Sequence, residues 1–289
     1  MTETKDAMGR VIRREMRTTA SPEEVWGALT DPAELARWFV DRAEGDAVTG
    51  GALTWYWDAF GAAVAQNVDD AEAPWRLVLS TALEKWTHLP EDVRAGMAGS
   101  RVVLDMRIAR EAGETVLRVV HSGFHVDAAF EDEYEGTSSG WQMALAVLKH
   151  YLERHRGQDR VEVLAFRPAT FDLADLRKAQ RTGSGLARWL TTSGEPARGD
   201  AFRLQLTSGR TLTGRMLAET DNEVLWSWDE LNGVLELKAF GMGGGRWMVG
   251  LRSSLWNAPA GLKAALQSEL DEAANRLVAA ISFAPTRDA

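Results

Sequence analysis

The sequence of 289 residues contains no cysteine. Disulfide bonds, thiol nucleophiles and zinc sites with thiolate ligands are therefore excluded. The five histidines offer no substitute, because the chain has no HExxH motif. His121 and His125 are four residues apart, but they lie at an expected strand end, where this spacing does not bring two ligands together as it would on a helix. We expect no metal ion and no cofactor.

Long apolar segments and clustered positive charge are also missing. No apolar run approaches the roughly 20 residues that span a bilayer. Residues 1–10 are polar and mixed in charge, unlike a secretory signal peptide. The net charge of -9 argues against nucleic acid or an anionic membrane as a partner, since such contacts need clustered lysine and arginine. The sequence predicts a soluble cytoplasmic protein with neither partner.

The segment Ser21–Phe39 reads SPEEVWGALTDPAELARWF and contains two helix starts. Its SPEE sequence offers a serine N-cap, a proline in the first turn and a glutamate at the capping-box position. Its DPAE sequence repeats this order ten residues later. The segment therefore predicts two short consecutive helices that meet at Asp31.

The rest of the first half alternates apolar and polar residues in short runs, as half-buried strands do. Strands are expected over residues 11–18, 52–58, 75–81, 101–109 and 115–122. From Ser139 to Arg156 the apolar residues recur at helical spacing, and Gly157 is placed to end that helix. The acidic run Glu131–Glu135 before it is expected to be a solvated loop. This order is that of an antiparallel sheet wrapped around one long helix.

Three motifs resemble a known family. They are the Ser21–Phe39 segment, His121-Ser122-Gly123-Phe124 at a strand end, and Gly140-Trp141 near the start of the last helix. Together they resemble the START-like superfamily (helix-grip fold, also called SRPBCC), and within it the homologues of the activator of the Hsp90 ATPase. The resemblance implies an apolar cavity between sheet and helix, which family members often hold.

The tetrapeptide LARW occurs twice, in Leu35–Trp38 and in Leu186–Trp189. Met16-Arg17 likewise matches Phe166-Arg167, each at an expected strand end. Internal self-similarity of this kind indicates a duplicated unit. The second copy has Phe171–Leu176 where the first has its helix motif, so it has diverged.

We therefore predict an α+β fold of two tandem helix-grip domains, each an antiparallel sheet wrapped around a long C-terminal helix. The first covers residues 1–157 and has the family motifs, and the divergent second covers residues 158–289. A chain of this length suits two cores. In the second copy, strands are expected over residues 161–166, 202–207, 211–218, 223–229, 234–240 and 246–251, and the closing helix over 257–281. Trp38 and Trp189 should occupy equivalent positions.

Twelve tryptophans are many for this length, and each can bury about 150–250 Å². They either fill the cores or line a cavity. We predict that the first copy holds the functional cavity, with Trp226, Trp228, Trp247 or Trp256 filling part of the second. The candidate wall residues are Trp38, Trp55, Trp57, Leu117, Val119, His121, Phe124, Trp141, Leu145 and Leu148. His121 is either a structural histidine or one that contacts the ligand.

Three functions remain open. The favoured one is non-catalytic binding of a small apolar or aromatic molecule between the sheet and the C-terminal helix. The second is a protein-interaction module that resembles the co-chaperone of the family name, with a protein as partner. The third is a cyclase-like or dehydratase-like enzyme that would use His121 or a cavity carboxylate as acid and base. No catalytic residue can be named, because no pair of carboxylates or Ser-His-Asp set stands out.

Overall fold

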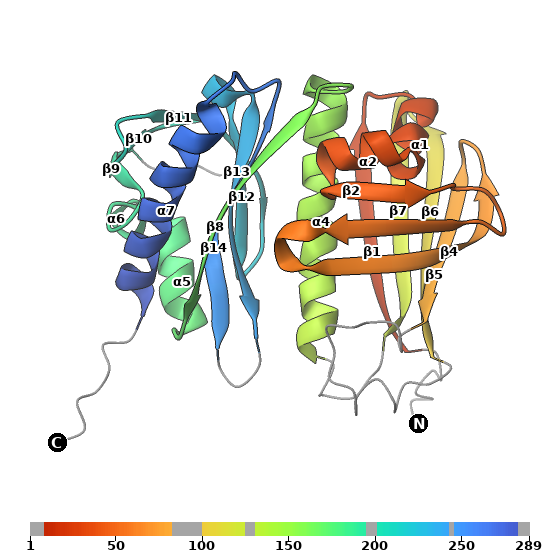
Figure 1. Ribbon diagram of the computed structural model, residues 1–289, viewed down its shortest axis with the longest axis horizontal. Helices are drawn as coiled ribbons and strands as arrows, with labels where there is room; N and C mark the ends of the chain where they lie inside the picture. Colours follow the sequence, from red (N-terminus) through yellow and green to blue (C-terminus); the bar gives the residue numbers. More distant parts are fainter. Residues whose placement is uncertain (1–8, 83–99, 125–130, 195–200, 243–245, 283–289) are drawn as a thin grey trace. The chain divides into compact units, whose positions relative to one another are not determined.

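The computed structural model describes residues 9–82, 100–124, 131–194, 201–242 and 246–282. His125 lies outside these ranges. The chain divides into two compact units, Met1–Gly157 and Gln158–Ala289, which are described here one at a time (Figure 1). In the described part of the chain, no helix combines the length and the apolar character needed to cross a membrane.

The first unit contains a seven-stranded antiparallel sheet with the order β1-β7-β6-β5-β4-β3-β2. Its strands are β1 (Arg10–Thr18), β2 (Arg42–Gly45), β3 (Ala52–Trp57), β4 (Ala62–Glu72), β5 (Arg76–Ala82), β6 (Arg101–Glu111) and β7 (Glu114–Phe124). Two short helices, α1 (Pro22–Thr30) and α2 (Pro32–Trp38), connect β1 to β2. The long helix α4 (Glu131–Arg154) follows the sheet and packs against β1.

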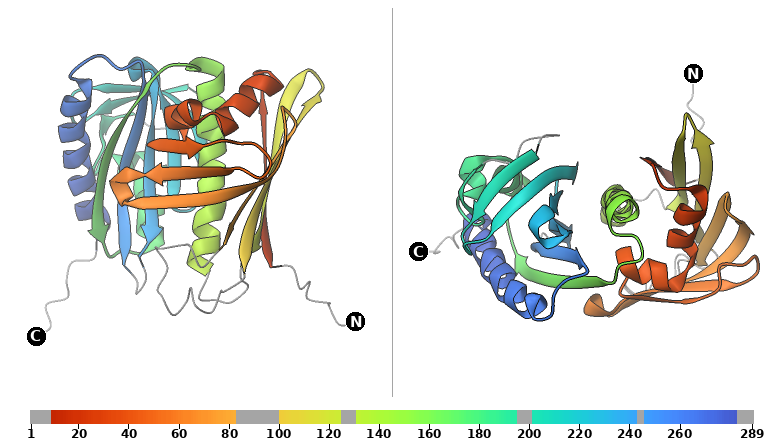
Figure 2. Two further views of the ribbon diagram at one scale, coloured as in Figure 1. Left: turned by 45° about the vertical axis from the view of Figure 1, so that its right-hand side comes forward. Right: turned by 90° about the horizontal axis from the view of Figure 1, so that it is seen from above.

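The second unit repeats this plan. Its seven antiparallel strands have the order β8-β14-β13-β12-β11-β10-β9, so the first strand again pairs with the last. They are β8 (Arg160–Ala169), β9 (Thr191–Ser193), β10 (Ala201–Leu206), β11 (Thr211–Glu219), β12 (Glu223–Trp228), β13 (Gly233–Gly241) and β14 (Trp247–Trp256). Helices α5 (Leu173–Arg181) and α6 (Gly183–Leu186) follow β8, and α7 (Leu262–Ile281) closes the unit. Seen from above, each sheet curves, and its closing helix lies on the concave side (Figure 2). The prediction of two helix-grip domains is confirmed.

The helix starts in the first unit follow the sequence pattern. The hydroxyl of Ser21 accepts the backbone N–H of Glu24 at 3.2 Å, and the Glu24 carboxylate accepts the N–H of Ser21 at 2.8 Å. The Asp31 carboxylate accepts the N–H of Ala33 at 2.8 Å and so caps α2. At the two helix starts, three of the backbone N–H groups that have no acceptor within the helix thus find one in these side chains.

Trp38 and Trp189 make the same contact in the two units. The indole Nε1–H of Trp38 donates to the carbonyl of Ala28 at 2.8 Å, and that of Trp189 donates to the carbonyl of Ala179 at 3.1 Å. Both carbonyls lie in the last turn of a helix, α1 or α5, where backbone acceptors lack a partner within the helix. Each tryptophan therefore caps the helix after β1 or β8. Trp38 ends α2, whereas Trp189 lies just after α6.

The structure corrects the prediction for the acidic run. Glu131–Glu135 forms the first turns of α4 rather than a loop, so the helix begins well before Ser139. Carboxylates are favourable at a helix N-terminus, because they complement the partial positive charge of its free N–H groups. Glu131 also pairs with Arg10 of β1 at 2.6 Å, and this pairing lowers the pKa of Glu131.

Both sheets are open, with β1 and β2 at the edges of the first and β8 and β9 at the edges of the second. The edge strands β2 and β9 have four and three residues. β1 has the sequence RVIRREMRT, which is rich in charge. β8 contains Pro168 at a position that pairs with Met248 of β14.

Candidate functional site

An aromatic cluster lies between the sheet and α4 in the first unit, and Phe39 stands at its centre. The Phe39 ring centroid is 4.8 Å from that of Trp38, 5.0 Å from Trp55, 5.6 Å from Trp57 and 6.2 Å from Trp141. Phe39 and Trp57 are only half-buried. Aromatic rings of α2, β3 and α4 thus meet at a place where part of their surface stays accessible.

The register of β3 explains how its side chains reach this cluster. Leu53 pairs with Gln66 of β4, and Trp55 pairs with Val64. Residues directly opposite in an antiparallel pair share a face of the sheet. Leu53 and Trp55, which are 0% and 6% exposed, therefore lie on the concave face together with Trp57. The alternation read from the sequence was correct for this strand.

Strand β7 and helix α4 supply the other side of the cluster. Leu117, Val119 and His121 alternate along β7, and the first two are fully buried. The indole Nε1–H of Trp141 on α4 donates to Nδ1 of His121 at 3.1 Å. This hydrogen bond joins the helix to the sheet. Leu145 and Leu148 are buried further along α4.

His121 is held as a neutral imidazole. Because its Nδ1 accepts the indole N–H, the ring proton sits on Nε2, which can donate. Burial among apolar groups lowers the pKa of His121 to about 4. The centroid of the Phe124 ring lies 4.7 Å from that of the His121 imidazole and 5.7 Å from that of the Tyr134 ring. In the described part of the chain, His121 makes no hydrogen bond with a carboxylate, so it has no partner for acid–base work.

Acid should destabilise the protein through His121. The unfolded chain takes up the proton near the ordinary pKa of 6.5, whereas the native state does so only near 4. The contribution of His121 to the free energy of unfolding is therefore fully present above pH 6.5, and it is lost as the pH falls to 4. The loss should reach about 2–3 kcal/mol.

Urea unfolding of wild type and His121→Phe across this pH range isolates the contribution. His150, whose pKa burial lowers to about 3, acts in the same direction and is retained in both proteins. The free energy of unfolding should fall more steeply with decreasing pH in wild type than in His121→Phe. An equal dependence on pH in the two proteins would contradict the assignment of His121 as a neutral imidazole.

Arg14 Nε, on β1, is one of three side-chain N–H groups on the concave face of the first unit that are buried without a hydrogen-bond partner among the described residues. The other two belong to β3 and β4. They are Nε1 of Trp55 and Nε2 of Gln66, both buried. Both side chains are 6% exposed. Because Gln66 is opposite Leu53, it is a diagonal neighbour of Trp55 on the same face. Sequence reasoning missed Gln66, since β4 was not expected.

A separate surface pocket of about 260 Å³ lies beside α1 and α2, at the end of α4. Two of the three carboxylates that line it have partners. Glu24 pairs with Arg156 at 2.9 Å, and Glu34 pairs with Arg37 at 2.5 Å and accepts the hydroxyl of Tyr151 at 2.6 Å. Charged side chains thus line this pocket together with Gly27 and Ala28. Nowhere in the described ranges do three potential metal-ligating side chains of His, Asp or Glu gather.

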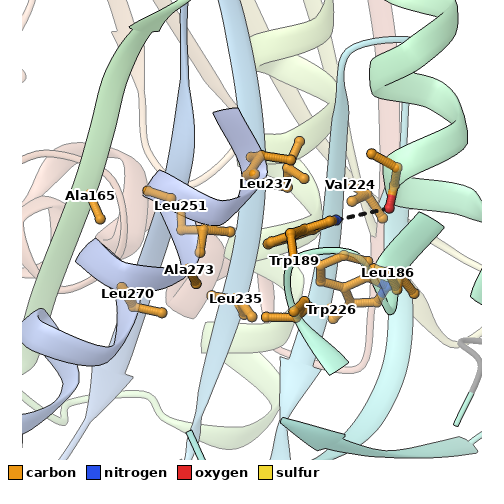
Figure 3. Close-up of a cluster of buried hydrophobic side chains, with 14 of the residues drawn as sticks. Ala165, Leu186, Trp189, Val224, Trp226, Leu235, Leu237, Leu251, Leu270 and Ala273 are labelled. Atoms are coloured by element: carbon orange, nitrogen blue, oxygen red, sulfur yellow. Dashed lines mark hydrogen bonds between the residues drawn. The ribbon is translucent and has the colours of Figure 1, made fainter. Parts of the chain in front are cut away.

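The second unit fills the corresponding space with its own side chains (Figure 3). Trp189, Trp226 and Trp228 are at most 1% exposed and belong to one continuous apolar core. Leu235 and Leu237 of β13 and Leu270 of α7 pack in the same core. Where β3 presents Leu53 and two indoles, β10 presents Phe202, Leu204 and Leu206, all three of them buried. The aromatic site thus belongs to the first unit.

Ten residues were predicted to line a cavity. The structure brings six of them into or beside the aromatic cluster: Trp38, Trp55, Trp57, His121, Phe124 and Trp141. The other four are buried on β7 and α4: Leu117, Val119, Leu145 and Leu148. Their role toward a ligand stays a prediction. Phe39 was missed, although it ends the family-like segment.

Comparison with protein families gives one match. The family model described as "Activator of Hsp90 ATPase homolog 1-like protein" matches residues 19–153. The first unit is similar to this family over those residues. Its SRPBCC helix-grip fold commonly binds hydrophobic ligands. Among curated proteins, none matches the chain significantly.

Several solved structures are similar to the chain. The Aha1 dimer from Colwellia psychrerythraea is 22% identical, with 51% of this chain and 99% of that chain covered and a TM-score of 0.42. The di-domain ARO/CYC BexL of the BE-7585A biosynthetic pathway is 10% identical, with coverages of 96% and 100% and a TM-score of 0.42. DynU16, from the dynemicin biosynthetic locus, is 16% identical, with coverages of 93% and 98% and a TM-score of 0.41.

Proposed function

We propose that the first unit binds a small apolar or aromatic molecule between its sheet and α4. The observation that carries this proposal is the cluster around Phe39, where rings from three elements converge and two of them, Phe39 and Trp57, are only half-buried. Apolar surfaces with a few polar groups are the usual sites for small ligands. Affinity for hydrophobic molecules is common among proteins with this fold, which supports the proposal.

The second unit has a structural role in this proposal. Its core is filled by Trp189, Trp226 and neighbouring leucines. Catalysis is not part of the proposal, since the neutral His121 has no carboxylate partner among the described residues. The partner is a small molecule.

Titration with the uncharged dye N-phenyl-1-naphthylamine tests the proposal. Excitation of the tryptophans should give saturable energy transfer to one dye per chain. Trp57→Ala should weaken binding about tenfold or more, because the dye loses a half-exposed ring surface to pack on. Trp247→Ala is the matched control, since Trp247 is also half-buried but belongs to the second unit.

The control should leave the dye affinity unchanged. Absence of a saturable site, or a site that Trp247→Ala weakens and Trp57→Ala does not, would overturn the proposal. Circular dichroism of each variant confirms that the comparison is made between folded proteins.

A further inference from the structure

The indole N–H group of Trp55 has no hydrogen-bond acceptor among the described residues. The residue is 6% exposed, and its Nε1 is buried without an acceptor in the described part of the chain. Buried N–H groups in folded proteins almost always have a partner. The Trp38 and Trp141 indoles of the same cluster do have one, at Ala28 and His121. Trp55 is the exception among these three buried indoles, and its ring packs edge-on against Phe39 at the half-exposed centre of the cluster.

Gln66 places a second unpaired N–H beside Trp55. Its Nε2 is also buried without a partner, and the register puts the two side chains diagonally on the concave face. Such diagonal neighbours are close enough for both to reach one small group. Neither N–H group has an acceptor among the described residues.

The charges near these two N–H groups indicate whether a ligand acceptor should be charged or neutral. The rings that pack on Trp55 in the cluster are Phe39 and Trp57, and the His121 imidazole on β7 is neutral at pH 7. Arg14 also faces this side of the sheet, but it lies on the edge strand β1, which β7, β6, β5 and β4 separate from β3, and its guanidinium donates to Ser138 of α4. A buried carboxylate or sulfonate needs a cation beside it, whereas a neutral carbonyl oxygen needs only a hydrogen-bond donor. The site therefore favours an uncharged acceptor on an apolar frame.

We propose that the ligand class of the first unit is planar aromatic carbonyl compounds, such as aryl ketones and quinones, and that the indole N–H of Trp55 and the amide of Gln66 donate to the carbonyl oxygen. This rests on the proposed function, since it names the ligand of the same site. The rings pack on Phe39 and Trp57, and the oxygen fixes the orientation.

Two probes that differ only in the carbonyl oxygen test this assignment. 2-Acetylnaphthalene and 2-isopropylnaphthalene share the ring system and have side groups of similar size. Wild type should bind the ketone about tenfold more tightly, because only the ketone satisfies the buried donors. Trp55→Phe keeps a ring but removes the N–H, so the ratio of its two affinities should fall to about one, whatever the change in its affinity for the hydrocarbon.

Trp226→Phe provides the matched control. Nε1 of Trp226 is also buried without a partner, but in the filled core of the second unit. This variant should keep the tenfold preference. An infrared spectrum of the bound ketone gives a second readout in wild type, where the carbonyl stretch should shift to lower frequency than in hexane. That measurement decides the question even if Trp55→Phe does not fold.

The outcomes separate the two proposals. If neither naphthalene binds, the proposed function itself fails. Equal binding of both probes by wild type, with an unshifted carbonyl stretch, would leave the apolar site intact and overturn the carbonyl assignment. Tighter binding of 2-naphthoate than of the ketone would also overturn it, in favour of an anionic ligand. Loss of the preference for the ketone in Trp226→Phe would show that the donor to the ketone lies in the second unit, and it would overturn the assignment to Trp55.

Discussion

Trp141→Ala should lower the free energy of unfolding by about 3–5 kcal/mol and abolish binding of naphthalene probes. The indole is 7% exposed, stacks near Phe39 with 6.2 Å between centroids, and donates to His121. Its removal leaves a large cavity between α4 and the sheet. It also leaves Nδ1 of His121 without a donor, which adds to the cost.

Trp141→Phe separates the ring from its N–H. It should cost only about 1–2 kcal/mol, since the ring still fills the space and one hydrogen bond is lost. Guanidinium unfolding measures both variants, and hydrogen exchange of peptides from residues 161–281 serves as an internal reference. A fall of similar size in the two variants would show that the hydrogen bond, rather than ring packing, dominates at this position.

Trp38→Ala and Trp189→Ala should each destabilise their own unit by about 3–5 kcal/mol. The two indoles are 2% and 0% exposed, and each caps the last turn of the helix after β1 or β8. Each replacement empties a core site and leaves the carbonyl of Ala28 or Ala179 without its donor. Hydrogen exchange of backbone amides, measured on peptides from each unit, shows which of the two units is destabilised.

In Trp38→Ala, faster exchange should appear in peptides of α1 and β3, and in Trp189→Ala in peptides of α5 and β10. Phenylalanine at either position should recover most of the loss. If only one of the two alanine variants were destabilised, the two tryptophans would not be equivalent in energy, despite their matching hydrogen bonds.

The sequence was most informative where short-range chemistry decides the structure. The caps at Ser21 and Asp31 and the alternation in β3 and β7 depend on neighbours along the chain, and the structure has them as expected. The repeat of LARW correctly paired Trp38 with Trp189, because the same indole–carbonyl bond needs the same spacing of ten residues to its acceptor.

What was missed depends on contacts between distant segments. Phe39 follows the last helical residue of α2 and has no periodic pattern, so its central place in the cluster could not be read from the chain. Gln66 lies on β4, whose alanines and acidic residues give little strand signal. The start of α4 was misplaced because an acidic run resembles a loop until Arg10 is seen beside Glu131.

The open sheets have a consequence for behaviour at high concentration. An exposed strand edge is a template on which another chain can add a strand, and duplication doubles the number of such edges. Here β2 and β9 are too short to template much pairing, and β8 carries Pro168, which lacks the N–H that a ladder needs. β1 is long but rich in arginine, with Arg17 paired to Glu111 at 3.1 Å. The fold thus carries built-in protection against edge-to-edge aggregation.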